Sequence, residues 1–448
     1  MPSPLDELRA QFDNAPYPRI PLDQSPATDY NMQFVHSMVT PYYLRYRRAV
    51  DTVGKVILDA GCGTGYKAHL LAIANPGATI IGVDLSEESV KLARQRLDYH
   101  QIPNTEFYTL LIEDLPSLGI HFDYINCDET LYLVPDPLTA LRAMTSVLKP
   151  DGILRVNLHS ALQRHAFYRA QELFRAIGLM KPETSQSEAV QVVINTMKAL
   201  KPDVVLKQHT WKPEYEQPGG DGSILANHLL VGDKGFTIPD VFDLLGAANL
   251  EFLSMVNWRH WQVPDLFKES DDLPALWGMS LMAADPPAQL RMYELLHPVS
   301  RLLDIWCVRA DAAPPGIPVD AWDDEAWQWA RVHLHPVLRA APIREAAIAS
   351  VNTGQPFELT RYIDLPAMGA VALTGLETAC LLPLWDEPQT VAALTQRWQQ
   401  IQPVEWTTLE PLSENTAFAK VQNLLNRLDA FLYVLAELDS SHHKAFSF

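Results

Sequence analysis

The chain has 448 residues, more than one hydrophobic core ordinarily organises, so two or three domains are expected. Hydrophobic residues make up 48% and charged residues 20%, as in globular rather than disordered chains. The 35 Lys and Arg against 54 Asp and Glu give a formal charge of −19. This excess disfavours nucleic acid as a partner, because its phosphates would be repelled.

The lengths of the apolar stretches and the spacing of the cysteines bear on where the protein is located in the cell. The first residues lack the apolar stretch of a signal peptide, and no run of about 18 apolar residues indicates a membrane span. The cysteines are far apart and form no CxxC pair, which argues against a disulfide framework and a zinc site. We therefore expect a cytoplasmic protein with no membrane partner. The cysteines are Cys62, Cys127, Cys307 and Cys380.

Residues 1–50 are expected to form an N-terminal arm and helix. Residues 1–30 are rich in Pro and polar side chains, which predicts an extended arm. The stretch from Tyr30 to Val50 is predicted to be one helix.

From residue 51 the pattern changes to short apolar runs separated by amphipathic stretches. Helices are predicted at Thr64–Ala74, after the N-cap Ser86, and after Asp136-Pro137, where Pro stands at the first helical position. Regular alternation of strand and helix implies a parallel sheet covered on both faces, the doubly wound α/β class. The predicted strands are Val56–Ala60, Thr79–Asp84, Thr105–Leu110, Phe122–Cys127 and Ile153–His159.

The sheet is expected to be completed only after insertions. A helical region at 160–200 and a loop at 201–224 precede a helix at Thr237–Leu245 and a sixth strand within 247–256. A seventh strand is predicted at Leu302–Val308. The core would then span residues 51–310, with insertions at about 160–235 and 259–300 that build a helical lobe.

After an Ala- and Pro-rich linker, residues 321–448 are expected to form a mainly helical C-terminal domain. The tripeptide Asp386-Glu387-Pro388 predicts a break between two helical segments. Eight Lys and Arg against fifteen Asp and Glu favour protein contact or homodimerisation over DNA binding.

The stretch ValIleLeuAspAlaGlyCysGlyThrGly at 56–65 carries the clearest chemical signal. Glycines at 61, 63 and 65 allow a sharp turn after a strand and close approach of a ligand. A dinucleotide site would prefer glycine at 66, where this chain has Tyr66. Asp84 stands at the end of the second strand, where a carboxylate can accept hydrogen bonds from both ribose hydroxyls.

This Asp-x-Gly-x-Gly-x-Gly turn resembles motif I of class I S-adenosylmethionine-dependent methyltransferases. GluAspLeuPro at 113–116 resembles the family's adenine-contacting segment, and PheAspTyrIleAsnCysAspGlu at 122–129 resembles its strand-four motif. LeuLysProAspGlyIleLeu at 148–154 completes the series, and the match covers about residues 54–160. The resemblance implies a methyltransferase with a Rossmann-like seven-stranded sheet, S-adenosylmethionine as cofactor and S-adenosylhomocysteine as product. The cofactor-binding residues that it implies are Asp59, Gly61, Cys62, Gly63, Gly65, Asp84, Leu85, Glu113, Asp114 and Cys127.

Three shorter segments, at 12–26, 227–242 and 381–394, are similar to bacterial methyltransferases with a regulatory domain and a C-terminal winged-helix-like region. That group includes bacterial protein-lysine methyltransferases. The arm departs from its pattern, since Ser25 stands where a histidine is common.

Candidate catalytic side chains lie at the carboxyl ends of the fourth and fifth strands, where this architecture binds ligands. They are Asp128, Tyr132 and His159, with Glu129 beside them. Tyr17 of the arm is a candidate lid over the cofactor. We find no acidic triad for a metal, and the Asn/Asp-Pro-Pro-Tyr signature of many amino-group methyltransferases is absent, which disfavours a nucleic-acid base as acceptor.

Three functions remain open from the sequence. The first is methylation of a protein side chain, and the second is methylation of a small metabolite. The third is a non-catalytic S-adenosylmethionine-binding regulator whose C-terminal region binds a partner. The acceptor and the methylated atom are not identified by these residues.

Overall fold

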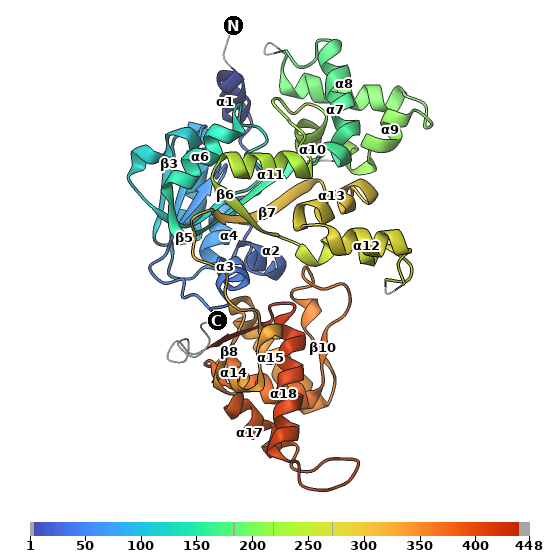
Figure 1. Cartoon of the computed structure of the whole chain (residues 1–448). Helices are drawn as coiled ribbons and strands as arrows, with labels where there is room; N and C mark the ends of the chain where they lie inside the picture. The colour runs from blue at the N-terminus through green and yellow to red at the C-terminus, as the bar shows by residue number, and fades with distance from the viewer. Residues whose placement is uncertain (1–3, 182–183, 218, 271, 439–448) are drawn as a thin grey trace.

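The centre of the molecule is a sheet of seven strands, in the upper left part of Figure 1. The structure is a computed structural model that describes residues 4–181, 184–217, 219–270 and 272–438. The strand order across the sheet is β3-β2-β1-β4-β5-β7-β6. The strands are β1 (Val56–Ala60), β2 (Thr79–Asp84), β3 (Thr105–Thr109), β4 (Phe122–Cys127), β5 (Leu148–His159), β6 (Leu250–Met255) and β7 (Leu302–Arg309).

Strands β1 to β5 pair in parallel, as the alternation of strands and helices predicted. β7 lies between β5 and β6 and runs antiparallel to both. The strand order reverses at β1, with β2 and β3 on one side and β4 and β5 on the other. Such a reversal opens a crevice at the carboxyl edge of the sheet, between β1 and β4. The predicted seven-stranded α/β sheet is therefore confirmed.

Helices cover both faces of the sheet, because successive residues of a strand point to opposite sides. In β1, Ile57 packs in the cluster of α4 and α5, whereas Leu58 packs in the cluster of α6 and α11. Ser86 and Asp136 cap α5 and α6 through their side chains, as predicted. These helices are α4 (Tyr66–Ala74), α5 (Glu87–Tyr99), α6 (Pro137–Val147) and α11 (Ile238–Ala247).

Two N-terminal predictions were wrong. Residues 4–14 form a helix, α1 (Pro4–Asn14), where an extended arm was expected, and only residues 15–29 lack helix and strand. The expected single helix from Tyr30 to Val50 is two helices, α2 (Tyr30–His36) and α3 (Val39–Tyr46). The break occurs at Ser37, whose backbone is extended with ψ 121°. Arg47 then ends α3 in the left-handed conformation, with φ 50°.

A helical lobe stands beside the sheet, at the upper right of Figure 1. It has a hydrophobic cluster of its own, to which Phe174, Val190 and Ile224 belong. The expected loop at 201–224 contains two short helices, so that prediction was wrong in part. The lobe helices are α7 (Ala161–Ala176), α8 (Gln186–Ala199), α9 (Val205–Thr210) and α10 (Gly220–Asn227), and α12 (Ala275–Ala283) and α13 (Pro286–Leu296) follow β6.

The last part of the chain lies below the sheet in Figure 1 and is mainly helical, as predicted. The predicted break at 386–388 separates α16 from α17. A three-stranded antiparallel sheet in the order β11-β8-β12 was not predicted. The elements are α14 (Asp324–Trp329), α15 (Ala341–Thr353), α16 (Gly375–Leu381), α17 (Val391–Ile401), α18 (Glu414–Asp429), β8 (Ala330–Leu334), β9 (Phe357–Glu358), β10 (Ala372–Leu373), β11 (Gln389–Thr390) and β12 (Val434–Leu438).

Short 3-10 helices complete the described elements. They are Ile112–Leu118, Pro213–Glu216, Trp258–Trp261, Pro264–Leu266, Val319–Ala321, Pro336–Arg339, Leu359–Arg361 and Leu382–Trp385. In the described ranges, none of the helices has the length and apolar character needed to cross a membrane. The predicted C-terminal region runs to residue 448, and residues 439–448 lie outside the described part of the chain.

The α2–α3 segment joins the sheet to the C-terminal part. Met38 packs in the hydrophobic cluster that the sheet forms with α4 and α5. Phe34 and Tyr43 pack in the hydrophobic cluster of the C-terminal part. The Tyr43 hydroxyl contacts the buried carboxylate of Asp429 and accepts a 2.8 Å hydrogen bond from the backbone N–H of Ala436. Burial raises the pKa of Asp429 to about 6, while the Tyr43 hydroxyl and a nearby guanidinium lower it. The Tyr43 hydroxyl is therefore a hydrogen-bond partner for two buried groups of the C-terminal part, the Asp429 carboxylate and the Ala436 N–H.

We expect Tyr43→Phe to lower the free energy of unfolding by about 1–3 kcal/mol, because it leaves buried polar groups without a partner. Tyr46→Phe on the same helix is the matched control, since its hydroxyl makes a single 3.2 Å hydrogen bond to the Asp151 carbonyl at an exposed position. Its cost should be below about 0.5 kcal/mol. Urea unfolding of both variants measures the difference, and equal losses would contradict the assigned role of Tyr43.

Candidate active site

A cavity of about 300 Å³ lies at the carboxyl edge of β1 to β4. Its walls come from the segments that follow these four strands, from the arm and from one face of α1. Of the sequence-predicted site residues, those that line it are Gly61, Cys62, Gly63, Asp84, Leu85, Glu113 and Asp128. Those that do not line it are Asp59, Gly65, Asp114, Cys127, Tyr132 and His159.

The turn between β1 and α4 forms the floor of the cavity. Gly61, Gly63 and Gly65 have φ of 83°, 50° and 80°, which glycine adopts far more readily than other residues. A Cβ on Gly61 would overlap the side chain of Thr130, and one on Gly65 would lie 2.7 Å from the Ala93 Cα. Both the backbone conformation and the packing of neighbouring segments therefore require glycine in this turn.

Asp84 holds the same turn from the end of β2. Its carboxylate accepts hydrogen bonds of 2.9 Å from the backbone N–H groups of Gly63 and Ser86. Burial raises the pKa of Asp84, and these two hydrogen bonds oppose that rise. Each oxygen has a further lone pair for a ligand hydroxyl.

The arm lies directly on the glycine turn. The backbone N–H of Thr64 donates to the Tyr17 carbonyl at 3.1 Å, and the Thr64 hydroxyl donates to the Pro18 carbonyl at 2.8 Å. The buried guanidinium of Arg96 on α5 donates to the carbonyls of Ile20, at 2.7 Å, and of Pro21, at 2.8 Å. Four hydrogen bonds thus fix residues 17–21, of which Tyr17, Pro18 and Ile20 line the cavity.

Helix α1 closes the cavity from above. Leu5, Leu8 and Phe12 line it and follow the i, i+3, i+7 spacing of one helix face. At the end of the helix, the Ser86 hydroxyl donates to the carboxylate of Asp13 at 2.6 Å. The cover of the cavity is consequently apolar and is tied to the N-cap of α5.

Asp128 is buried, and three basic side chains surround it. The Lys67 Nζ lies 2.7 Å from Asp128 Oδ2, with an Arg155 nitrogen at 3.5 Å and the His36 Nε2 at 3.4 Å. Burial alone would raise the pKa of Asp128, but Arg155 and Lys67 hold it well below its usual value. These two cations therefore favour the ionised form of Asp128. Lys67 also lines the cavity, and the sequence analysis did not identify it.

Glu129, the next residue, also lines the cavity but has a different environment. Its carboxylate pairs with the guanidinium of Arg301, just before β7. Its backbone is left-handed, with φ 56°, and its N–H donates to Asn157 Oδ1 at 2.7 Å. Burial raises the pKa of Tyr17, and the charge of Glu129 adds to that rise, so phenol and carboxylate share this end of the cavity.

His159 and Tyr132 stack on each other behind the cavity wall, with ring centroids 3.6 Å apart. The His159 Nδ1 lies 2.6 Å from Asp233 Oδ1, and its Nε2 lies 3.0 Å from an Arg301 nitrogen. A guanidinium can only donate, so the Nε2 accepts and the Nδ1 carries the proton. Burial lowers the pKa of His159 to about 4, although Asp233 opposes this. The imidazole is thus neutral, with both nitrogens engaged.

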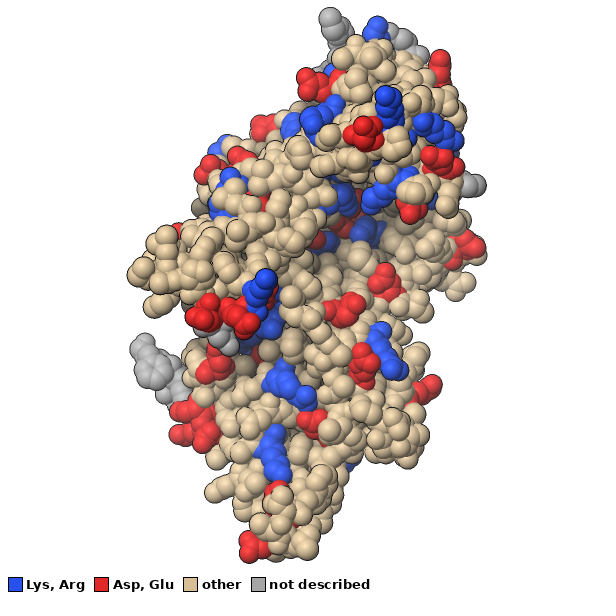
Figure 2. All heavy atoms as spheres, turned by 90° about the vertical axis from the view of Figure 1, so that its right-hand side faces the viewer, with Lys and Arg blue, Asp and Glu red and all other residues tan. Residues whose placement is uncertain are grey.

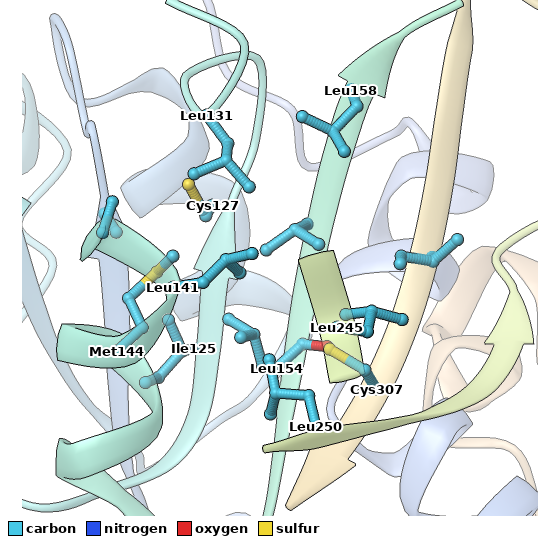
Figure 3. Close-up of a cluster of buried hydrophobic side chains, with 14 of the residues drawn as sticks. Ile125, Cys127, Leu131, Leu141, Met144, Leu154, Leu158, Leu245, Leu250 and Cys307 are labelled. Carbon is cyan, nitrogen blue, oxygen red and sulfur yellow. The ribbon is translucent and has the colours of Figure 1, made fainter. Parts of the chain in front are cut away.

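The remaining predicted residues lie farther from the cavity. The Cys127 side chain belongs to a buried hydrophobic cluster, beside Leu131 in Figure 3. Asp114 is exposed in a 3-10 helix. Asp59 is buried, with one oxygen accepting a 3.0 Å hydrogen bond from Asn126 and the other without a partner, and burial raises its pKa to about 7. Within the described part of the chain, no group of three or more His, Cys, Asp or Glu is placed to hold a metal.

Comparisons with known proteins agree with this geometry. Residues 51–218 match a family model described as a methyltransferase domain. A protein of Synechococcus sp. described as uncharacterized protein syc1184_c is 32% identical over 399 residues, which cover 87% of this chain and 88% of that protein. The ubiquinone biosynthesis O-methyltransferase of Neisseria meningitidis is 32% identical over 132 residues, 28% of this chain and 55% of that enzyme.

Among solved structures, PKMT2 from Rickettsia typhi has a TM-score of 0.57 and 15% identity, covering 95% of this chain and 78% of that one. The same protein has been solved in complex with AdoHcy. The chain spans about half the length of the ubiquinone enzymes that it matches, and the match covers 28% of this chain. The chain therefore contains a class I S-adenosylmethionine-dependent methyltransferase domain, so it is a methyltransferase, and S-adenosylmethionine is its cofactor.

Proposed function

We propose that this methyltransferase acts on an amine of a protein side chain, with lysine as the acceptor residue. The observation that carries the proposal is the fixed position of the helical lobe beside the cavity. The buried carboxylate of Asp233 lies 2.6 Å from His159 at the end of β5 and 2.8 Å from Arg164 on α7. The lobe is therefore anchored at the end of β5, the strand beside β4, and the segment that follows β4 lines the cavity.

The surface beside this anchor is suited to a large acceptor. Figure 2 shows a hollow beneath the lobe, with acidic and basic side chains lying side by side in it. Residues 160–235 carry nine Lys or Arg and eight Asp or Glu, so the excess negative charge of the chain lies elsewhere. The likeness to PKMT2 over 95% of the chain includes the lobe and the C-terminal part, whereas the match to the ubiquinone enzyme covers 28% of this chain.

The cavity residues fit the cofactor. S-adenosylmethionine supplies a methyl group that is already activated on a sulfonium. We assign the ribose hydroxyls to Asp84, the adenine to the wall formed by Leu85 and Glu113, and the methionine end to the glycine turn and Lys67. We do not assign Asp114 and Cys127 as cofactor-binding residues, because they do not line the cavity. Asp59 does not line the cavity, but it is buried two residues before Gly61 and has one oxygen without a partner, so it remains a candidate.

The arrangement aligns an acceptor and excludes water rather than providing a strong base. Asp128 is held ionised by Lys67 and Arg155, and both nitrogens of His159 are engaged. Alignment and desolvation alone lower the barrier of such transfers by roughly 7–11 kcal/mol. An amine acceptor suits this site because, once its proton has passed to solvent water, its lone pair can attack the methyl group without a base from the protein.

We also propose that the chain is divided into two functional parts. Residues 51–310 form the catalytic unit with insertions at about 160–235 and 259–300, and residues 321–448 form a C-terminal domain used for protein contact. The four buried, unpaired cysteines suit the reducing cytoplasm.

Asp84→Asn should weaken cofactor binding about tenfold or more, because an amide nitrogen replaces one of two acceptor oxygens. Isothermal titration with S-adenosylhomocysteine measures the change in Kd. Asp311→Asn is the control, since that carboxylate pairs with Arg309 at an exposed position away from the cavity. An unchanged Kd in Asp84→Asn would show that the ribose lies elsewhere.

The ring of His159 should remain neutral throughout the physiological range. Its folded-state pKa of about 4 lies below the ordinary 6.5, so the unfolded chain takes up the proton first as the pH falls. This group therefore contributes stability that is lost between about pH 6.5 and 4. NMR titration of the histidine ring protons, assigned with His159→Asn, should give a midpoint near 4, and a midpoint between 6 and 7 would reinstate it as a candidate base.

The acceptor class can be tested with tritiated methyl groups. The full chain is incubated with labelled cofactor and an extract of cells lacking the gene, and polypeptides are separated from low-mass compounds. We expect label in polypeptides, released as methyl-lysine on hydrolysis, with Asp84→Asn as the background. Label confined to the low-mass fraction would contradict the proposal and favour a metabolite acceptor, for which the ubiquinone enzymes are the precedent.

A further inference from the structure

Glu129 has features that its role as an ion-pair partner does not explain. It lines the cavity, and its backbone has φ 56°, a conformation that costs a non-glycine residue free energy. The N–H of Glu129 donates to Asn157 Oδ1, while Asn157 Nδ2 donates to Asp128. One amide side chain therefore holds the Glu129 backbone and the Asp128 carboxylate.

We propose that Glu129 binds the ammonium group of the acceptor side chain and that Arg301 is the counter-ion displaced when the acceptor enters. This inference rests on the proposed function, since it requires a cationic amine as acceptor. It adds an acceptor-binding residue and a means of selecting positive charge.

The contrast with Asp128 shows why Glu129 is the exchangeable carboxylate. The Asp128 side chain is 4% exposed and is surrounded by Lys67 and Arg155. The Glu129 side chain is 27% exposed, and among the described contacts its carboxylate has one cationic partner, the Arg301 side chain, which is 41% exposed. A half-exposed guanidinium leaves at low cost, because water solvates it as it moves.

Arg301 also has hydrogen-bond partners other than Glu129. One of its nitrogens lies 3.0 Å from the His159 Nε2, and its backbone carbonyl accepts a 2.9 Å hydrogen bond from Ser160. The guanidinium can therefore release Glu129 without leaving the site. In the absence of acceptor it neutralises a carboxylate that would otherwise lie uncompensated in a half-buried cavity.

The experiment uses n-butylammonium, which reproduces the lysine side chain, titrated into the full chain loaded with S-adenosylhomocysteine. Neutral n-butanol, of similar shape, separates charge recognition from apolar contact. We expect the wild type to bind the ammonium in preference to the alcohol. Glu129→Gln should weaken ammonium binding roughly tenfold or more, the range for a charge-assisted hydrogen bond, with the affinity for S-adenosylhomocysteine unchanged.

Two further variants test the counter-ion. Arg301→Gln should strengthen n-butylammonium binding, because the competing cation is gone, whereas Arg301→Lys should not. Glu405→Gln is the matched control for loss of a carboxylate, since Glu405 pairs with Lys420 at 32% exposure in the C-terminal part. Unselective binding by the wild type, equal affinity in Glu129→Gln, or weaker binding in Arg301→Gln would each overturn the inference.

This outcome is independent of the labelling experiment. Labelled polypeptides together with an unaffected Glu129→Gln variant would refute the role of Glu129 and leave the proposed function standing. Charge-selective binding that depends on Glu129, with no labelled polypeptide, would support the role of Glu129 and refute the protein acceptor.

Discussion

Three segments of the chain contact the turn between β1 and α4. Each segment can come this close only because the glycine that it contacts has no Cβ. The carbonyl of Tyr17 faces Gly63, the side chain of Thr130 faces Gly61, and the backbone of Ala93 faces Gly65. The arm, the loop after β4 and helix α5 thus meet at one point. The shape of the cavity follows from this contact, because these segments carry most of its polar lining.

Electrostatic balance is the second constraint on the site. The cavity brings Lys67, Asp128 and Glu129 together, and Arg155 and Arg301 lie directly behind them. Charges in a partly desolvated space are stable only when they are paired, so each carboxylate has its own cation. The two carboxylates differ because the Asp128 side chain is buried beside Lys67 and Arg155, whereas the Glu129 side chain is 27% exposed and pairs with Arg301. Adjacent residues of the same charge therefore have different chemistry.

Much of the sheet could be predicted because its signals are local. An apolar run of five or six residues with a glycine turn or a cap after it defines β1, β2 and β4, and Asp84 follows from its place at a strand end. The strands β8 and β12 could not be found in this way. They pair across about a hundred residues, Val434 with Leu334, and nothing local marks them as partners. Helix α1 was not predicted, because the proline-rich residues that follow it led us to expect an extended arm over the whole of residues 1–30.

The same distinction separates the site residues that were found from those that were not. Asp128 lies in a recognisable motif, but Lys67 and Arg301 are ordinary basic residues whose importance depends on contacts 61 and 172 positions away. Conversely, His159 and Tyr132 have reactive side chains and the expected strand-end positions, yet the fold turns them behind the wall. Position along a strand predicts the edge of the sheet on which a residue lies, whereas its neighbours decide whether it faces the ligand.

The network around Asp233 fixes the helical lobe against the methyltransferase core. Asp233 and Arg164 have fully buried side chains, and Gln171 donates to the same carboxylate at 2.9 Å. Burying such a pair is costly in desolvation and adds little net stability, but removing one partner leaves an uncompensated charge. Its benefit is positional, because these hydrogen bonds hold α7 and the loop at 227–233 against the end of β5. The same His159 that contacts Asp233 also contacts Arg301, the partner of Glu129. The lobe and Glu129 of the cavity are therefore joined by one hydrogen-bonded chain, so a displacement of the lobe would be transmitted to the Glu129–Arg301 pair.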